Sequence, residues 1–302
     1  MAILFEVSAK KPGNVNFVVG FEGTRVEHFL ASAVAAAPSF EEAAKRGIAV
    51  ANGKMKISEV GMGQIMKDCV ADIDASQRGG NTLLGTVMLF IPIAVAAGMT
   101  PMNAKGEFNL AKLRENIKLA TEATTAQDAV DLYEAIAIAK PSGLNDAPDL
   151  SVTSSESKTR LIKENVSLFK VFQIAAGYDD ICYEWVNNFP ISFDLAYPYL
   201  CDQLIGKKKC LNTAITHTFL KVLSERPDTF ISRKVGLEKT RAVSAEVAQV
   251  LQLGGLETPE GRESIWEFDK KLRECGNNYN PGTTADITAA TLALCTLSGY
   301  RP

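Results

Sequence analysis

The chain has 302 residues, of which 46% are hydrophobic and 22% are charged, a balance typical of folded globular proteins. Its net charge of -3 lacks the basic excess that nucleic-acid-binding proteins show, so we expect no nucleic-acid partner. The 6 cysteines are scattered without a C-x-x-C pair and there are only 2 histidines, which argues against a disulfide framework and a structural zinc site.

Hydrophobic residues recur at helical period along nearly the whole chain. The predicted helices, in chain order, cover residues 26–37, 39 onward, 58–75, 81–97, 107–121, 126–139, 158–176, 181–187, 193–204, 208–224 and 238–253, one entered at Thr258, and one after Pro281. We expect Pro38 to interrupt the first of them, with a capping box at Ser39 and Glu42 starting the next. Helices 107–121 and 126–139 are expected to form an antiparallel pair.

The one β-like run is Asn14 to Val19, and a single strand cannot form a sheet. The sequence therefore predicts an all-α fold, organised as a single multi-helix domain over residues 1–302. Residues 141–157 are rich in Pro, Ser, Asp and Asn, and we expect a long irregular loop there. Such a loop is either a lid or binding loop or a disordered linker.

The first residues meet a charge at Glu6, which is not typical of a secretion signal. The most apolar stretch, residues 83–97, is too short and too interrupted by Gly and Pro to span a bilayer. We therefore expect a cytoplasmic protein without a membrane partner.

Polar residues gather at five boundaries between predicted elements. In the first, residues 6–14, the Lys11-Pro12 step favours an extended or turn conformation that can aim the lysine ammonium at an anion. A plain surface turn explains that stretch equally well. In the second, residues 21–29, Glu27 lies near a helix start, where a solvated charge is the simpler interpretation.

The third boundary, residues 76–82, has a Gly-Gly turn before an apolar helix. Such a turn exposes backbone N–H groups at the positive end of the helix dipole, although a tight turn is the default interpretation. The fourth comprises Asp179-Asp180 and residues 227–233. Adjacent aspartates either bind a hard cation such as Mg²⁺ or lie in the first turn of a helix.

The fifth boundary, NPGTTADIT at residues 280–288, precedes the last apolar helix. Thr283 and Asp286 fit a helix-capping pattern, but a cap does not require Pro-Gly before it. Gly282 would let a ligand approach the backbone closely, and free amides and threonine hydroxyls would suit a phosphate. Asp286 would then be available to a metal ion or a sugar hydroxyl.

In this order, these stretches resemble the triphosphoribosyl-dephospho-CoA synthases, all-helical enzymes that make the precursor of the prosthetic group of citrate lyase and malonate decarboxylase. The resemblance is carried by EVSAKKPGN (6–14), FLASA (29–33), GGNTLLGT (79–86), DTFISRKVG (228–236) and NPGTTADIT (280–288). Two departures are typical of an outlying branch, of which an archaeal one is an example. Asn14-Val15 stands where bacterial synthases carry Leu-Val, and Thr283-Thr284 replaces Gly-Ser.

The resemblance implies that ATP loses adenine and that C1′ of its ribose is joined to the 2′-hydroxyl of dephospho-CoA. ATP is then a substrate, Mg²⁺ assists, and the partners are small molecules, with a homodimer as a further expectation. The implied nucleotide contacts are Lys11, Gly13, Asn14, Arg78, Asn81, Thr82, Arg233, Gly282, Thr283 and Thr284. The implied catalytic carboxylates are Glu6, Glu27, Asp228 and Asp286. The implied metal ligands are Asp228 and Asp286; Asp179 and Asp180 are further candidate metal ligands from the adjacent-aspartate pattern alone.

Two alternatives remain open at this point. The same helical scaffold can carry nucleotide-dependent ribosyl transfer or hydrolysis with another acceptor, because a shared fold does not determine the substrate. A non-catalytic helical binding protein is the other alternative. It would leave polar helix starts near Asn81 and Thr283 to be satisfied by caps or water alone.

Overall fold

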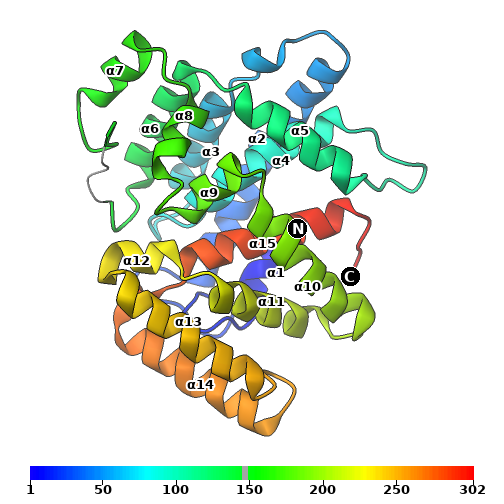
Figure 1. The fold of residues 1–302 in the computed structure, drawn as a ribbon, viewed down its shortest axis with the longest axis vertical. Helices are drawn as coiled ribbons and strands as arrows, with labels where there is room; N and C mark the ends of the chain where they lie inside the picture. The colour runs from blue at the N-terminus through cyan, green and yellow to red at the C-terminus, as the bar shows by residue number, and fades with distance from the viewer. Residues whose placement is uncertain (145–148) are drawn as a thin grey trace. The chain divides into compact units, whose positions relative to one another are not determined.

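The computed structural model describes residues 1–144 and 149–302 (Figure 1). These residues form fifteen α-helices joined by turns and short 3-10 and π-helical segments, and they contain no strand beyond two isolated bridges. The predicted all-α fold is confirmed. None of the helices within the described ranges combines the length and the apolar character that a bilayer span requires.

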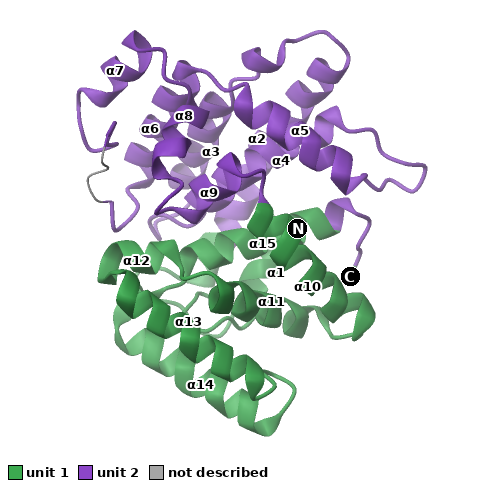
Figure 2. Cartoon of the chain, viewed as in Figure 1, with its two compact units in different colours: residues 1–29, 190–295, 302 green, residues 30–189, 296–301 purple. Residues whose placement is uncertain are grey.

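The chain divides into two compact units (Figure 2). Unit 1 comprises residues 1–29, 190–295 and 302, and unit 2 comprises residues 30–189 and 296–301. Both units are therefore built from segments that are distant in sequence. The expectation of a single domain over residues 1–302 stays a prediction.

Unit 1 holds α1 (Ala2–Ser8), α10 (Tyr197–Cys201), α11 (Leu211–Glu225), α12 (Thr229–Val235), α13 (Leu237–Gln252), α14 (Pro259–Glu274) and most of α15 (Gly282–Leu297). Two π-helical segments, Ile191–Ala196 and Asp202–Gly206, flank α10. Unit 2 holds most of α2 (Val26–Ala51), with α3 (Met62–Ser76), α4 (Leu84–Met99), α5 (Leu110–Glu122), α6 (Ala126–Ala139), α7 (Ser157–Lys163), α8 (Leu168–Ala175) and α9 (Asp180–Val186).

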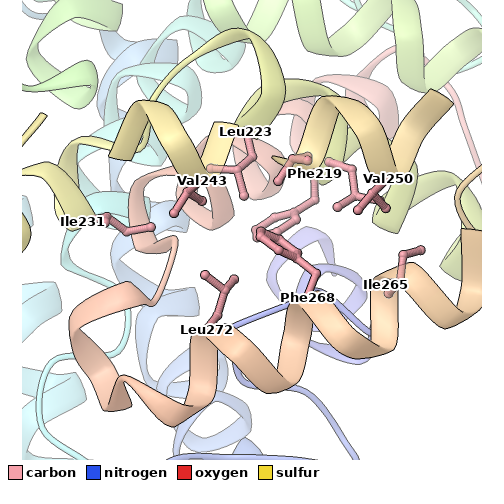
Figure 3. Close-up of a cluster of buried hydrophobic side chains, with 10 residues drawn as sticks. Phe219, Leu223, Ile231, Val243, Val250, Ile265, Phe268 and Leu272 are labelled. Carbon is pink, nitrogen blue, oxygen red and sulfur yellow. The ribbon is translucent and has the colours of Figure 1, made fainter. Parts of the chain in front are cut away.

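A hydrophobic core joins α11 to α14 in unit 1 (Figure 3). On α13 and α14 the core residues recur at intervals of three or four, and on α11 Phe219 and Leu220 lie four and three positions before Leu223, so that each helix uses one face. The cluster consists of Phe219, Leu220, Leu223, Ile231, Val243, Val247, Val250, Ile265, Phe268 and Leu272. Ile231 ties the short helix α12 to this core, which fixes the position of Asp228 at the start of that helix.

In unit 2 the apolar helix α4 is buried on most sides, as expected, and contacts α3, α5 and α9. It also meets α2 at a crossing of two glycines. A Cβ atom on Gly47 would collide with the carbonyl oxygen of Val95, and one on Gly98 would collide with that of Ala44. Only glycine at both positions allows the two backbones to approach so closely.

Helix α2 continues from Val26 to Ala51, so the expected interruption at Pro38 is wrong. Proline removes one backbone hydrogen bond and strains the preceding turn, but it does not change which face of the helix is buried. The buried residues keep a spacing of three or four on both sides of it; they are Ser32, Ala36, Ser39, Ala43 and Gly47. Packing of this continuous face outweighs the local cost.

Two further expectations need correction. The helix expected over residues 158–176 is broken into α7 and α8, because Asn165 adopts a positive φ of 51° and Ser167 caps α8. Helices α5 and α6 do not form an antiparallel pair, since α5 packs on α4 and α6 packs on α3. The short helix α1 was not expected.

The irregular stretch 141–157 is confirmed for residues 141–144 and 149–156, while residues 145–148 lie outside the described part. Within unit 2, two contacts hold residues 149–156 in place. The hydroxyl of Tyr133 donates to the carbonyl of Leu150, and Arg160 Nη1 lies 2.8 Å from Asp149 Oδ1. Residues 14–19 form a turn, because Asn16 Oδ1 accepts from the amides of Val18 and Val19.

Candidate functional site

One carboxylate in unit 1 joins the starts of two helices. Oδ1 of Asp228 accepts from the amides of Phe230 and Ile231 at 2.9 and 3.0 Å and so caps α12. Oδ2 accepts from both the amide and the hydroxyl of Thr284 in the first turn of α15, each at 2.7 Å. Asp228 is only 1% exposed. A single buried negative charge therefore lies at the positive end of both helix dipoles.

This arrangement revises what was expected of the α15 start. An anion does dock there, but it is the carboxylate of Asp228, which occupies the amide and hydroxyl of Thr284 that were predicted to bind phosphate. Thr283 is the second residue of α15, and its Oγ1 accepts from the hydroxyl of Thr229 at 3.2 Å. At Gly282 the close neighbour is the ring of Phe230, whose Cδ1 would lie 3.0 Å from an added Cβ.

Lys11 and Glu6 form a buried ion pair, with Nζ 3.1 Å from Oε1. The ammonium also donates to the carbonyl oxygens of Glu6, Ala9 and Val15, at 2.6, 3.3 and 3.4 Å. Burial raises the pKa of Glu6 and lowers the pKa of Lys11, and the attraction between them opposes both shifts. Since every close acceptor of Lys11 is internal, the geometry favours a role in holding the 9–15 turn over direct contact with phosphate.

The Pro-Gly-Asn turn is anchored to α14. Asp269 Oδ1 accepts from the amide of Gly13 at 2.7 Å and from Arg273 Nε at 2.9 Å. Arg273 Nη2 donates to the carbonyl of Asn14 at 2.6 Å. Gly13 has a φ of 67°, and an added Cβ would lie 2.6 Å from Leu272 Cδ1, so both the backbone conformation and the space require glycine.

The same turn reaches the NPGTTADIT segment. Asn14 Nδ2 donates to Asn280 Oδ1 at 2.9 Å, and Asn280 Nδ2 donates to Asn277 Oδ1 at 3.1 Å. Residues 6–16, 228–234 and 277–286 are thus connected by hydrogen bonds through Asn14, Asn280 and Asp228. We call these three segments the polar junction. Glu6, Lys11, Gly13, Asn14, Asp228, Gly282, Thr283 and Thr284 all belong to it.

Arg233 and Asp286 also lie in segments of the polar junction, whereas Glu27 lies outside them. Arg233 is partly buried in the last turn of α12, with its guanidinium carbon 5.5 Å from the centroid of the Phe230 ring. Asp286 is partly buried and follows Thr284 along α15. Because α15 begins at Gly282, Asp286 lies beyond the capping positions. Glu27 is exposed in the first turn of α2.

Unit 2 contains a second hydrogen-bonded pair of predicted stretches. The hydroxyls of Ser32 and Thr82 lie 2.7 Å apart and so join the FLASA stretch to the GGNTLLGT stretch. Asn81 Oδ1 accepts from the amide of Leu84 at 3.1 Å and caps the start of α4. Gln77 stabilises the Gly79-Gly80 turn through two hydrogen bonds. Its Oε1 accepts from the amide of Gly79, and its Nε2 donates to the carbonyl oxygen of Gly80 at 2.8 Å.

A hollow lies beside this turn, lined by Asp74, Gln77, Gly80, Asn81 and Thr82 together with apolar side chains. Its enclosed volume is only about 10 Å³, roughly the room that one water molecule needs. The hollow is therefore too small to enclose a nucleotide. Arg78 is exposed, and its Nη1 donates to the carbonyls of Asp74 and Gln77.

The adjacent aspartates of the predicted metal site have separate roles. Asp179 caps α9 by accepting from the amides of Ile181 and Cys182 at 2.9 and 3.2 Å, while Asp180 is buried in the first turn. Asp228 already accepts four hydrogen bonds, which matches the capacity of a carboxylate. Within residues 1–144 and 149–302 there is no group of three or more His, Cys, Asp or Glu side chains that could hold a metal ion.

Sequence reasoning missed several residues that hold these sites together. Lys234 and Ser32 lie inside stretches that carried the resemblance but were not singled out. The i,i+4 spacing of Asp269 and Arg273 predicts an ion pair on α14, but nothing local indicates that it anchors a distant turn. Gln77 precedes a Gly-Gly turn that the sequence did identify.

Comparison with known proteins gives three findings. The family model of CitG, ATP:dephospho-CoA triphosphoribosyl transferase, matches residues 1–302. Protein CitXG of Leuconostoc mesenteroides subsp. cremoris is 29% identical over 117 residues, and the match covers 37% of this chain and 23% of that protein, so about a quarter of its length. A crystal structure from Archaeoglobus fulgidus, described as a triphosphoribosyl-dephospho-CoA synthase, superposes with a TM-score of 0.63 at 20% identity and covers 90% of this chain and 100% of that one.

Proposed function

The chain belongs to the ATP:dephospho-CoA triphosphoribosyl transferase family, and we propose that it transfers the triphosphoribosyl group of ATP to dephospho-CoA with release of adenine. The observation that carries the proposal is the match of the family model over all 302 residues. The low identity to the two relatives is that of a divergent member. The acceptor is therefore the part of the proposal that most needs a direct test.

The geometry supports a functional use of the five stretches. Three of them meet in the polar junction of unit 1, through the Asn14–Asn280 and Asp228–Thr284 contacts. The other two meet in unit 2, through the Ser32–Thr82 contact. Buried polar contacts between helix starts are costly unless they are satisfied, and here they are satisfied mutually. The stretches thus form preorganised local structures.

The proposed reaction breaks the bond between C1′ and the adenine nitrogen of ATP and forms a bond between C1′ and the 2′-oxygen of dephospho-CoA. The hydroxyl proton must leave, and adenine must be protonated as it departs. Positive charge develops at C1′, as in glycoside cleavage, and a nearby carboxylate stabilises it. We assign this chemistry to Asp286 and Glu27, which lie at the surface or partly buried, whereas Asp228 and Glu6 act as positioning residues.

We propose that Mg²⁺ enters with the substrate, as MgATP. It binds proteins through one or two carboxylates together with substrate phosphates, and a closed cage of protein ligands is not needed. We propose Asp286 as a carboxylate that would contact the Mg²⁺ of the bound substrate. Arg233, and in unit 2 Arg78, Asn81 and Thr82, remain the predicted phosphate and sugar contacts.

The test is adenine release from MgATP with and without dephospho-CoA, with the product identified by mass. Release that depends on dephospho-CoA, together with a product larger by the triphosphoribosyl group, is the expected result. Release without dephospho-CoA would instead assign a hydrolase or another acceptor. The absence of adenine release under both conditions would contradict ribosyl transfer altogether.

A further inference from the structure

Lys234 is a half-buried cation between two segments of the polar junction. Its chain leaves α12 and its Nζ donates to the carbonyl oxygen of Asn277 at 2.7 Å. The ammonium therefore lies between the 228–234 segment and the segment that leads into α15. It was not among the residues predicted from the sequence.

The ring of Phe230 fixes the ammonium on its other side. Nζ lies 3.7 Å from the ring centroid, which is a close cation–π contact. The same ring is packed on Gly282, where an added Cβ would lie 3.0 Å from Phe230 Cδ1. The aromatic ring thus positions the lysine relative to the first turn of α15, and little side-chain entropy is left to lose when a ligand binds.

The charge of Lys234 is poorly compensated for a half-buried group. Other partly or fully buried lysines have carboxylate partners, such as Lys11 with Glu6 at 3.1 Å and Lys67 with Asp131 at 3.2 Å. Among the described residues, no carboxylate lies within 4.0 Å of the Lys234 ammonium. Asp228 acts on it only from a distance, and Arg233 repels it.

Burial accordingly lowers the pKa of Lys234 to about 8, so the group is still mostly charged at neutral pH. An ammonium has three N–H donors, and the carbonyl of Asn277 takes one of them. A held, desolvated cation with donors to spare and a second cation beside it is the arrangement that binds phosphate oxygens.

We propose that Lys234 is a polyphosphate-binding residue of the polar junction and that its ammonium contacts the phosphate chain of the nucleotide. This assignment rests on the proposed function, which supplies a triphosphate ligand. The alternative is that Lys234 serves only to stabilise the carboxyl end of α12, where basic residues interact favourably with the helix dipole.

The probe is inorganic tripolyphosphate, titrated calorimetrically into the full-length protein at pH 7 and low ionic strength. We expect Lys234→Met to weaken binding about tenfold to a hundredfold, the effect of losing a charge-assisted hydrogen bond. Lys234→Arg should retain most of the affinity. Lys239→Met is the matched control, because Lys239 is an exposed lysine on α13 in the same unit, and it should change affinity less than about threefold.

The melting temperature separates the two roles. If Lys234 binds phosphate, Lys234→Met removes a poorly compensated charge and should leave the melting temperature unchanged or raise it. If Lys234 only stabilises the helix, the variant should have a lower melting temperature and unchanged affinity for tripolyphosphate. A lower melting temperature with unchanged affinity, or failure of the wild-type protein to bind tripolyphosphate, would overturn the assignment.

If tripolyphosphate binding depends on Lys234 but adenine release does not occur, the proposed function fails and the anion site stands. If transfer occurs and Lys234→Met binds normally, only the assignment fails.

Discussion

Asp228 and Thr284, which are 56 residues apart in sequence, form two hydrogen bonds of 2.7 Å through a single carboxylate oxygen. The other oxygen of Asp228 caps α12. The start of α15 is therefore positioned by the same group that starts α12. A ligand that binds near Gly282 therefore approaches a helix start whose positive end is already paired with this buried carboxylate.

We expect Asp228→Asn to lower the free energy of unfolding by about 2 to 4 kcal/mol. An asparagine keeps one acceptor oxygen, but its amide nitrogen donates and so faces the donors of Thr284. Urea unfolding measures the loss. The control is Asp179→Asn, because Asp179 caps α9 through Oδ1; this variant should lose less than about 1 kcal/mol, since asparagine is a good cap. Equal losses in both variants would contradict the role of the second oxygen.

The Lys11–Glu6 pair should behave as a buried ion pair. We expect Lys11→Met and Glu6→Gln each to lower the free energy of unfolding by about 3 to 5 kcal/mol, because each leaves a buried charged or polar partner. The double variant should lose less than the sum of the two. A double-mutant cycle from denaturant unfolding measures the coupling. Additive losses would show that the two side chains act independently, and a loss of nucleotide affinity without a loss of stability would restore the phosphate contact predicted for Lys11.

Asp286→Asn should lower the rate of adenine release at least about a hundredfold, while the melting temperature changes little. The reason is that Asp286 is only partly buried and lies beyond the capping positions of α15. Parallel measurement of turnover and melting temperature tests this. The comparison with Asp228→Asn is informative, because that variant should lose stability as well as activity. Damage to stability in Asp286→Asn as large as in Asp228→Asn would instead make Asp286 a structural residue.

Stability should fall on mild acidification because of His217. Its Nε2 accepts from the amide of Leu256 at 2.9 Å, and burial lowers its pKa below the ordinary value of 6.5. The unfolded chain therefore binds the proton first. Stability is complete above pH 6.5 and is lost as the pH falls from 6.5 toward the folded pKa, by at most about 1.4 kcal/mol per pH unit from this group.

The measurement is the free energy of unfolding between pH 5 and pH 7.5 for the wild type and for His217→Gln, whose amide oxygen can still accept from Leu256. The difference between the two curves gives the contribution of His217 to the pH dependence of the free energy of unfolding. The charged groups that act on His217 are Glu257, which favours protonation, and Lys209 and Lys207, which oppose it. Parallel curves for the two proteins would show that His217 is not the titrating group.

Local sequence patterns predicted the helices well where capping and periodicity agreed. Thr258 caps α14 as expected, since a threonine before Pro-Glu is an unambiguous start signal. They failed at Pro38, where the buried face of α2 is continuous, and at Asn165, whose left-handed backbone conformation no periodicity reveals. Both failures arise where tertiary packing or a single residue overrides local propensity.

By itself, the sequence determined the all-α class and the family, because hydrophobic period and short ordered stretches are properties of the linear chain. It also identified the segments that contain Asp228, Thr284 and Asn14. Only the tertiary structure decided what these residues do. A carboxylate, an ammonium or an amide acts through the groups within about 3 Å of it. Folding sets those neighbours, and here it gives Lys11 and Thr284 internal partners and places Lys234 beside Phe230 and Asn277.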